Sequence, residues 1–197
     1  VTLDHETLER TLDPVVRATG RTNAMDVEIA LPLFVLATQV RKDGYDRLAL
    51  GQGADELFGG YAKVARARSD PRVKAHTVRG ARREVMATLP DQLERDVLTV
   101  RAAGVEPVVP LLADRIVSVS LSLPDELLVT DRGERKWGFR LAARSWLPDR
   151  ITFREKKAVQ YGSLVARELD RLARQAGFKR RQNDHISTYI ESVCCSF

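Results

Sequence analysis

The sequence predicts an α/β domain that is mostly helical and holds only a few short parallel strands. Residues 47–50 contain the short apolar run Leu48-Ala49-Leu50, which stops at a glycine-rich loop. A strand this short and this apolar normally needs neighbours in a parallel sheet. Elsewhere, apolar residues recur at helical spacing between prolines, glycines and capping residues. The chain has 197 residues, which is long enough for one core with a helical extension.

Two helices are predicted before this strand. The first begins after capping-type residues near Asp4, is split or bent by Pro14, and is followed by a loop that contains Gly20. Residues 24–40 are mostly apolar and too long for one strand, so they predict a buried helix with Pro32 near its start. A turn then leads into residues 47–50, the one buried strand that the pattern predicts.

The rest of the chain reads mainly as helices. Residues 104–114 contain two prolines and predict an extended connection of buried character. Serines alternate with apolar residues over 116–123, and this period by itself favours a strand. We place the main domain at 1–177 and a C-terminal helical tail at 178–197. The helices predicted after the glycine-rich stretch cover residues 62–68, 73–89, 91–103, 135–146 and 164–176.

Composition excludes several function classes. The net charge of +5 comes mainly from arginine, which an ordinary solvated surface explains, and no nucleic-acid-binding motif occurs, so a nucleic-acid partner is not expected. The adjacent Cys194 and Cys195 have no metal-ligand spacing and indicate a reduced environment. We expect no signal peptide, and the sequence contains no apolar run of the ~18 residues that a membrane span needs. We therefore expect a cytoplasmic protein without a membrane partner.

The chemistry-bearing stretch is residues 50–61, which read LGQGADELFGGY. Its first glycines would let backbone N–H groups approach an anion closely. Asp55 and Glu56 follow directly, and Mg²⁺ typically reaches phosphates through one or two carboxylates. The alternative is a glycine-rich connection with a solvated acidic pair, and spacing alone gives the two interpretations about equal weight.

Three stretches together resemble the C-terminal synthetase domain of asparagine synthetases and their relatives, including the β-lactam synthetases. Residues 50–61 are similar to the family loop S-G-E-G-x-D-E-x-F-G-G-Y, and 104–112 match G-x-E-x-R-x-P-F-L-D loosely. Residues 136–140, 147–148 and 154–156 follow the order K-x-x-L-R, L-P and R-x-K. The resemblance covers about residues 20–165. It implies an adenine-nucleotide α-hydrolase-like fold, in which residues 116–123 are helical.

The same resemblance implies an active site. In this family ATP adenylates a side-chain carboxylate, pyrophosphate leaves, and ammonia attacks the acyl adenylate. Charge then develops on pyrophosphate, and backbone donors, Mg²⁺ and a cation stabilise it. The resemblance assigns ATP binding to Leu50, Gly51, Gln52 and Gly53, Mg²⁺ to Asp55, and catalytic roles to Lys156 and Glu56, of which Glu56 could instead orient the loop.

Three other residues belong to these signatures without a definite role. Lys136 and Arg140 are four residues apart on one face of the predicted 135–146 helix. They could anchor the catalytic residues from behind or form a solvated cationic face, and we weigh the two equally. Glu106 is expected to be a buried structural acid rather than a catalytic one.

The sequence departs from the family pattern in two ways. Gln52 replaces the loop glutamate, and an amide cannot deprotonate ammonia, although it can hydrogen-bond the substrate. The S-G-G-x-D-S loop, through which the family binds pyrophosphate, does not occur, nor does the glutaminase domain. We therefore expect a missing N-terminal half or a partner chain to supply that loop. An unpaired apolar strand edge predicts poor solubility or self-association of the chain alone.

These observations give two functional hypotheses. The first is an ATP-dependent ligase module of an asparagine-synthase-like, glutamine-hydrolysing parent enzyme, acting on aspartate or a similar carboxylate. The second is a catalytically incomplete remnant that serves as an interaction or regulatory subunit. Another pyrophosphatase-loop enzyme, for example one that modifies tRNA, is a weaker third, because the Gly-Gly-Tyr and Arg-x-Lys elements favour the asparagine synthetase branch.

Overall fold

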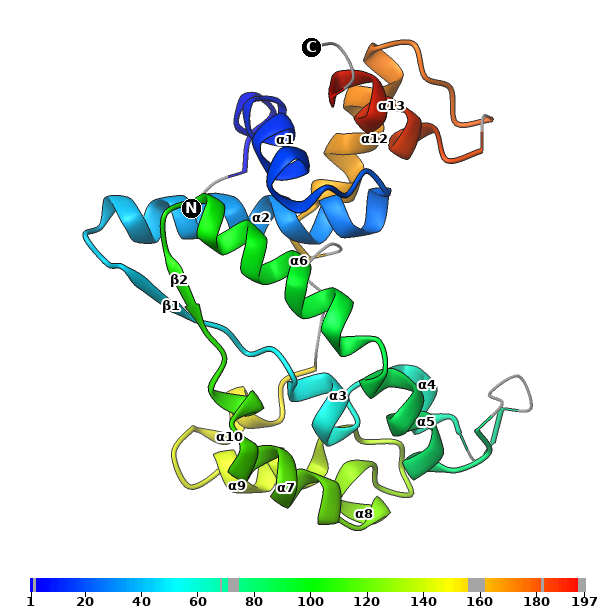
Figure 1. The fold of residues 1–197 in the computed structure, drawn as a ribbon. Helices are drawn as coiled ribbons and strands as arrows, with labels where there is room; N and C mark the ends of the chain where they lie inside the picture. Colours follow the sequence, from blue (N-terminus) through cyan, green and yellow to red (C-terminus); the bar gives the residue numbers. More distant parts are fainter. Residues whose placement is uncertain (2, 68, 71–74, 156–161, 182, 195–197) are drawn as a thin grey trace. The chain divides into compact units, whose positions relative to one another are not determined.

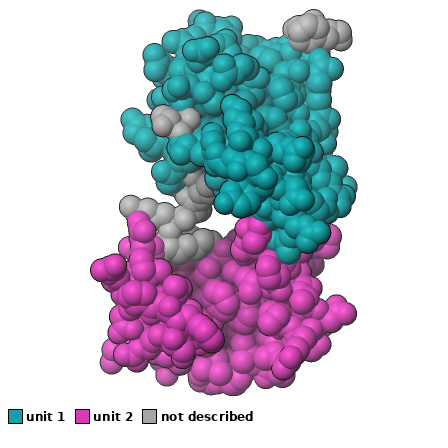
Figure 2. Space-filling model, turned by 90° about the vertical axis from the view of Figure 1, so that its left-hand side faces the viewer, with its two compact units in different colours: residues 1–48, 94–108, 157–197 teal, residues 49–93, 109–156 magenta. Residues whose placement is uncertain are grey.

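The computed structural model describes residues 1–197 apart from 2, 68, 71–74, 156–161, 182 and 195–197. Its described elements are mostly helices, with two short parallel strands, as the sequence predicts (Figure 1). The chain divides into two compact units (Figure 2). Unit 1 comprises residues 1–48, 94–108 and 157–197, and unit 2 comprises residues 49–93 and 109–156.

Unit 1 is a helical assembly with one apolar core. Leu8, Leu31, Leu169 and Ile190 come from four different helices and are fully buried in that core. The burial of large aliphatic side chains from every helix makes these helices mutually stabilising. The four helices are α1 (His5–Thr19), α2 (Ala24–Lys42), α12 (Val165–Gln175) and α13 (His185–Cys194).

The sequence predicts that Pro14 splits or bends the first helix; α1 runs as one element through Pro14, so it is not split. Both of its ends are capped, by the Asp4 carboxylate accepting from the Thr7 N–H and by Gly20 in the left-handed conformation. Caps and the burial of one apolar face offset the hydrogen bond that a proline removes. Pro32 lies well inside α2 and not near its start as predicted, because the helix already begins at Ala24.

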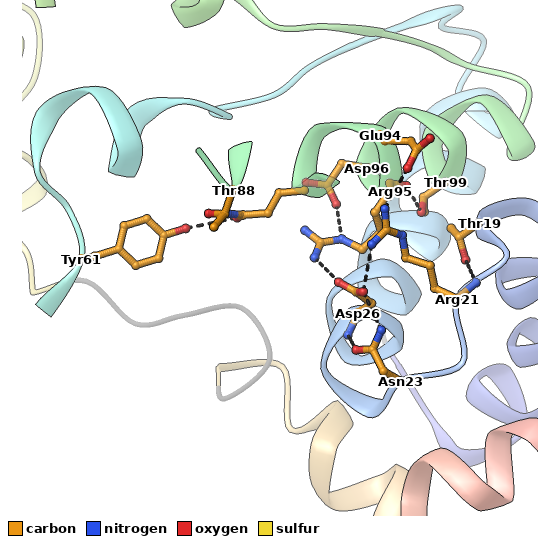
Figure 3. Close-up of polar contacts among 11 residues, drawn as sticks. Thr19, Arg21, Asn23, Asp26, Tyr61, Thr88, Glu94, Arg95, Asp96 and Thr99 are labelled. Atoms are coloured by element: carbon orange, nitrogen blue, oxygen red, sulfur yellow. Dashed lines mark hydrogen bonds and ion pairs between the residues drawn. The ribbon is translucent and has the colours of Figure 1, made fainter. Parts of the chain in front are cut away.

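A buried charge network joins α2 to the C-terminal part of α6 (Leu89–Ala102), the part that belongs to unit 1. Arg95 donates to Asp96 at 2.8 Å and to Asp26 at 2.7 Å, and Asp26 also accepts from Arg21 (Figure 3). Burial lowers the pKa of Arg95, but the two carboxylates outweigh burial and raise it. The charges are therefore paired, as burial requires.

The two strands are less buried than predicted. Strand β1 (Arg47–Ala49) pairs with β2 (Glu106–Val108), and the Glu106 N–H donates to the Asp46 carbonyl at 2.8 Å. Both strands show the pattern exposed, half-buried, exposed. The prediction of a buried strand at 47–50 is thus wrong for this structure. The two-stranded sheet among the described residues leaves strand faces open, whereas crossover helices cover both faces of a larger parallel sheet.

Unit 2 is built from short elements around a smaller core. Val64, Val78, Val85 and Leu128 are buried in that core. The elements are α3 (Ala54–Phe58), α4 (Ala62–Ala65), α5 (Val78–Met86), the 3₁₀ turn η1 (Pro110–Leu112), α7 (Asp114–Ser122), α8 (Asp125–Leu128), α9 (Trp137–Ala143) and α10 (Asp149–Thr152).

Helix α7 confirms the helix implied by the family resemblance against the strand favoured by the serine alternation. The buried guanidinium of Arg82 donates to the carbonyls of Ser120, at 2.8 Å, and Leu121, at 3.3 Å. These carbonyls belong to the last turn of the helix, where the regular i+4 donors end, and the Ser120 carbonyl otherwise accepts from the Leu123 N–H at 3.2 Å. The buried arginine therefore stabilises the helical end.

No single helix in the described ranges has the length and apolar character to cross a membrane. Helices α1 and α2 reach those values only as a pair, with a bend of 109° between them.

In unit 1, α13 packs against α12, α1 and α2. The domain boundary predicted after residue 177 stays a prediction.

Candidate active site

The stretch 50–61 lies in unit 2 and folds as a loop, one short helix and a second tight turn. Two of its glycines have positive φ: Gly53, at 87°, precedes α3, and Gly59, at 74°, ends it. Side chains other than glycine rarely adopt this conformation. The Gly-x-Gly and Gly-Gly spacing therefore follows from two backbone reversals that confine α3 to five residues.

Asp55 is held against the second turn. Its Oδ1 lies 3.1 Å from Nζ of Lys136, and both side chains are mostly buried. A Cβ on Gly60 would lie only 1.8 Å from the same Oδ1, so the carboxylate rests directly on the Gly60 backbone. Gly60 is thus required by close approach, since any larger residue would displace Asp55.

Glu56 points into the protein. It is 3% exposed and accepts a hydrogen bond of 2.7 Å from the Tyr61 hydroxyl. That hydroxyl also lies 3.1 Å from Gln92, which in turn donates to Thr88 (Figure 3). Burial and the Glu56 carboxylate raise the pKa of Tyr61 above its ordinary value. This geometry matches the orienting role that the resemblance allows for Glu56, because the carboxylate ties Tyr61 to α3.

The predicted nucleotide residues lie where the chain enters α3. Gly51 is exposed, Leu50 and Gln52 are half-buried, and Gly53 is buried. The Gly51 carbonyl accepts from the Ala54 N–H at 3.3 Å, and the Gly53 carbonyl accepts from Leu57 at 2.8 Å. Nothing lies within 4 Å of a Cβ built on Gly51, so its backbone is open to a ligand. The assignment of these residues to ATP stays a prediction.

Lys136 and Arg140 do not share a helix face. Lys136 is the residue before α9, in the left-handed conformation with φ 58°, and Arg140 lies within the helix. Arg140 donates to three carbonyls, those of Arg135 at 2.9 Å, Thr152 at 2.8 Å and Arg154 at 3.1 Å. The interpretation as a solvated cationic face is therefore wrong for both residues, because Lys136 is paired with Asp55 and Arg140 binds backbone.

Glu106 is exposed, so the expectation of a buried structural acid is wrong. Its carboxylate accepts two hydrogen bonds from Arg101, and this contact lowers the pKa of Glu106. Both residues belong to unit 1, whereas Asp55 belongs to unit 2. Lys156, the predicted catalytic lysine, lies outside the described residues.

The structure adds two residues that the motif analysis did not assign to the site. Arg135 donates to the Gly60 carbonyl at 2.9 Å, next to the Lys136–Asp55 contact. Phe139 stacks on Phe58 with ring centroids 4.7 Å apart and an interplanar angle of 25°. Segment 135–140 therefore contacts α3 and its closing turn at three places. Neither residue has a sequence signal for this role, because the pairing is long-range.

The comparison with known families identifies the family of the chain. The model of the family described as asparagine synthase matches residues 1–85 and 70–192. The chain belongs to the asparagine synthase family.

Relatives in the family are considerably longer than this chain. It is 28% identical to a putative asparagine synthetase [glutamine-hydrolyzing] 1 of Methanocaldococcus jannaschii, over 99% of this chain and 42% of that protein. It is 27% identical to asparagine synthetase 2 of rice, over 93% of this chain and 31% of the relative. The yeast asparagine synthetase 1 is 26% identical over 77% of this chain and 28% of its own length. The chain thus spans less than half of each of these relatives.

The number of possible ligand side chains limits how this member of the asparagine synthase family could hold Mg²⁺. The described ranges contain no group of three or more His, Cys, Asp or Glu side chains that could hold a metal ion. Glu56 is occupied by Tyr61, which leaves Asp55 as the one candidate carboxylate of the motif. This set does not fit a metal held by protein alone. It fits Mg²⁺ that is bound mainly by phosphates and water, with one carboxylate from the protein.

Proposed function

We propose that this chain is the synthetase module of an ATP-dependent, amide-forming ligase that makes asparagine or a similar amide. The observation that carries the proposal is the Asp55 carboxylate, fixed beside an open glycine loop in a chain that belongs to the asparagine synthase family. The printed names of the relatives, asparagine synthetase [glutamine-hydrolyzing], support the same reaction class.

In the proposed reaction a carboxylate oxygen of the substrate attacks the α-phosphorus of ATP, and pyrophosphate leaves. The nitrogen of ammonia then attacks the acyl carbon, AMP leaves, and one proton is released. Leu50, Gly51, Gln52 and Gly53 would line the nucleotide, with the exposed Gly51 backbone closest to it. Mg²⁺, when bound, would neutralise the departing pyrophosphate. Asp55 would provide the protein ligand, and Lys156 would contribute a cation to the same charge.

Glu56 and Gln52 take other roles in this proposal. Glu56 is buried under the Tyr61 hydroxyl, so it maintains the shape of α3 and its turn rather than contacting substrate. Gln52 can donate and accept hydrogen bonds but cannot accept a proton from ammonia at neutral pH. A different base, or solvent, would remove that proton.

The proposal includes an adenine-nucleotide α-hydrolase-like fold completed by a part that this sequence does not contain. That part, an N-terminal half or a partner chain, would carry the S-G-G-x-D-S loop and the strands that extend the β1–β2 sheet. We further propose that the assembled enzyme works in the cytoplasm. Self-association of the chain through its open strand edge is the alternative to such a partner.

The proposal is tested by measuring pyrophosphate release from ATP in the presence of aspartate and ammonia. The assay uses this chain together with a segment that bears the S-G-G-x-D-S loop. Asp55→Asn and Lys156→Ala should each lower the rate by ~100-fold or more, since both remove charge stabilisation of the leaving group. Lys63→Ala, which changes an exposed lysine of α4, is the matched control and should keep the rate.

Two outcomes would contradict the proposal. Unchanged rates in Asp55→Asn and Lys156→Ala would show that the site assignment is wrong. Absence of pyrophosphate release with every carboxylate offered, despite a folded assembly, would favour the remnant with an interaction or regulatory role.

A further inference from the structure

The contact between Lys136 and Asp55 has a consequence for metal binding. An ammonium group 3.1 Å from the buried Oδ1 of Asp55 repels any further cation that approaches this carboxylate. The Asp55 side chain is 22% exposed and that of Lys136 is 16% exposed, so solvent screens this repulsion only in part. Free Mg²⁺ would therefore meet a carboxylate that is already neutralised.

The chain keeps Lys136 at this position in several independent ways. Lys136 adopts a left-handed conformation that is unfavourable for a residue with a side chain, so surrounding contacts must impose it. Its carbonyl accepts from the Arg140 N–H at 2.9 Å, and Arg135 next to it donates to Gly60 at 2.9 Å. The Phe58–Phe139 stack adds an apolar contact between the same two segments. The lysine is thus placed by the fold and not by the ion pair alone.

We propose that Lys136 is a positioning residue that makes Asp55 selective for a metal–phosphate complex over the free metal ion. A phosphate-bound Mg²⁺ carries anionic oxygens that can accept hydrogen bonds from the ammonium group while the metal takes Asp55 as a ligand. A hydrated Mg²⁺ carries only positive charge and gains nothing from Lys136. This inference rests on the proposed function, because it assumes that the site takes metal with pyrophosphate or ATP.

The test measures binding of Mn²⁺, a spectroscopic substitute for Mg²⁺, by electron paramagnetic resonance, without and with inorganic pyrophosphate. Lys136→Asn removes the charge, while asparagine still tolerates the left-handed conformation. Lys136→Arg keeps the charge, and Lys63→Asn is the control at an exposed lysine of the same unit. We expect Lys136→Asn to bind free Mn²⁺ about 10-fold more tightly than the unmodified chain, since removal of a nearby like charge has an effect of this order. Lys136→Arg and Lys63→Asn should stay at the original value.

The gain must also depend on Asp55. In the double variant Asp55→Asn/Lys136→Asn, free Mn²⁺ affinity should return to the original value. In the single variant Asp55→Asn, free Mn²⁺ affinity should stay unchanged while affinity for Mn²⁺–pyrophosphate falls. This single variant leaves Lys136 in place and so keeps the test valid if Lys136→Asn does not fold.

The proposal is overturned if Lys136→Asn binds free Mn²⁺ no better than the original chain, or if its gain persists without Asp55. It is also overturned if Asp55→Asn weakens free Mn²⁺ binding in the original background. Failure of the ligase reaction is a separate result: a metal gain in Lys136→Asn without pyrophosphate release from ATP would refute the proposed function and leave this inference standing.

Discussion

The two units of the chain are stabilised in different ways. Unit 1 combines long helices, such as the 19-residue α2, around a core of leucine, isoleucine and valine side chains. Unit 2 consists of short helices around a smaller core, and arginines bind its backbone carbonyls. Examples are Arg82 at the end of α7, Arg135 at Gly60 and Arg140 at Thr152.

The predicted site residues 50–56 lie in unit 2, the unit in which arginines bind backbone carbonyls. Apolar burial is non-directional, so the shape of unit 1 depends on how much surface its helices bury. Hydrogen bonds to carbonyls and close approaches at glycines fix particular atoms to within a fraction of an ångström. Such contacts are suited to hold a carboxylate like Asp55 in one place. The two units should therefore respond differently to substitution.

The largest effect is expected in the core of unit 1. Leu31→Ala removes a fully buried side chain of α2 and should lower the free energy of unfolding by about 2–5 kcal/mol. Leu36→Ala, on the same helix but at a position 42% exposed, is the control and should cost less than about 1 kcal/mol. Urea unfolding followed by far-UV circular dichroism measures both. Equal losses in the two variants would contradict the importance assigned to this core.

A smaller but more local effect is expected at Gly60 in unit 2. Gly60→Ala places a methyl group on Asp55 Oδ1, so the carboxylate must move, at a cost of about 1–3 kcal/mol. The tryptophan fluorescence spectrum of the Gly60→Ala variant should also change, because Trp137 is adjacent to Lys136, the partner of Asp55. Gly51→Ala meets nothing within 4 Å and should change stability by less than about 0.5 kcal/mol. If both variants unfold at the same urea concentration, the close approach at Gly60 is not a constraint.

The smallest effect concerns a polar contact of unit 1 and depends on pH. Asp170 accepts from Arg180, His185 and Arg174, and these contacts, led by Arg180, outweigh burial and hold the pKa of its carboxyl well below the ordinary range. A lowered pKa in the folded state stabilises the fold above the unfolded pKa of about 4, and this contribution disappears as pH falls through the folded value.

Asp170→Asn should therefore lose about 1–2 kcal/mol at pH 7. Its deficit relative to the unmodified chain should shrink steadily as the pH is lowered below about 4. Thermal unfolding measured between pH 2 and 7 determines this difference in stability. Asp149→Asn, which removes an exposed surface pair with Arg144, is the control and should be nearly neutral at every pH. A deficit in Asp170→Asn that is constant over the whole range would refute the contribution of the charged carboxylate.

Much of unit 1 and the position of the motif were predictable from sequence. Local signals decide these features: the cap at Asp4, the Gly20 terminus and the long apolar stretch of α2 all lie within a few residues of what they control. The turns of the motif were likewise predictable, because Gly53 and Gly59 occupy conformations that glycine favours.

The incorrect predictions have long-range causes. Serine alternation over 116–123 by itself favoured a strand, against the helix that the family resemblance correctly implied, and Arg82, 38 residues away from Ser120, stabilises the end of that helix. Helical spacing placed Lys136 and Arg140 on one face, but the chain enters α9 only after Lys136. Glu106 and strand β1 were expected to be buried, and their exposure follows from the partners around them rather than from their own composition.

The sequence by itself determined the family, the mostly helical character and the place of the LGQGADELFGGY motif, because these depend on residues close together in the chain. Only the tertiary structure decided what each of the two acids of that motif contacts. Glu56 is buried beneath Tyr61, whereas Asp55 rests on Gly60 beside Lys136. The physical reason is that Lys136 is 81 residues from Asp55 in sequence, and no local pattern encodes which distant cation will neutralise a given carboxylate.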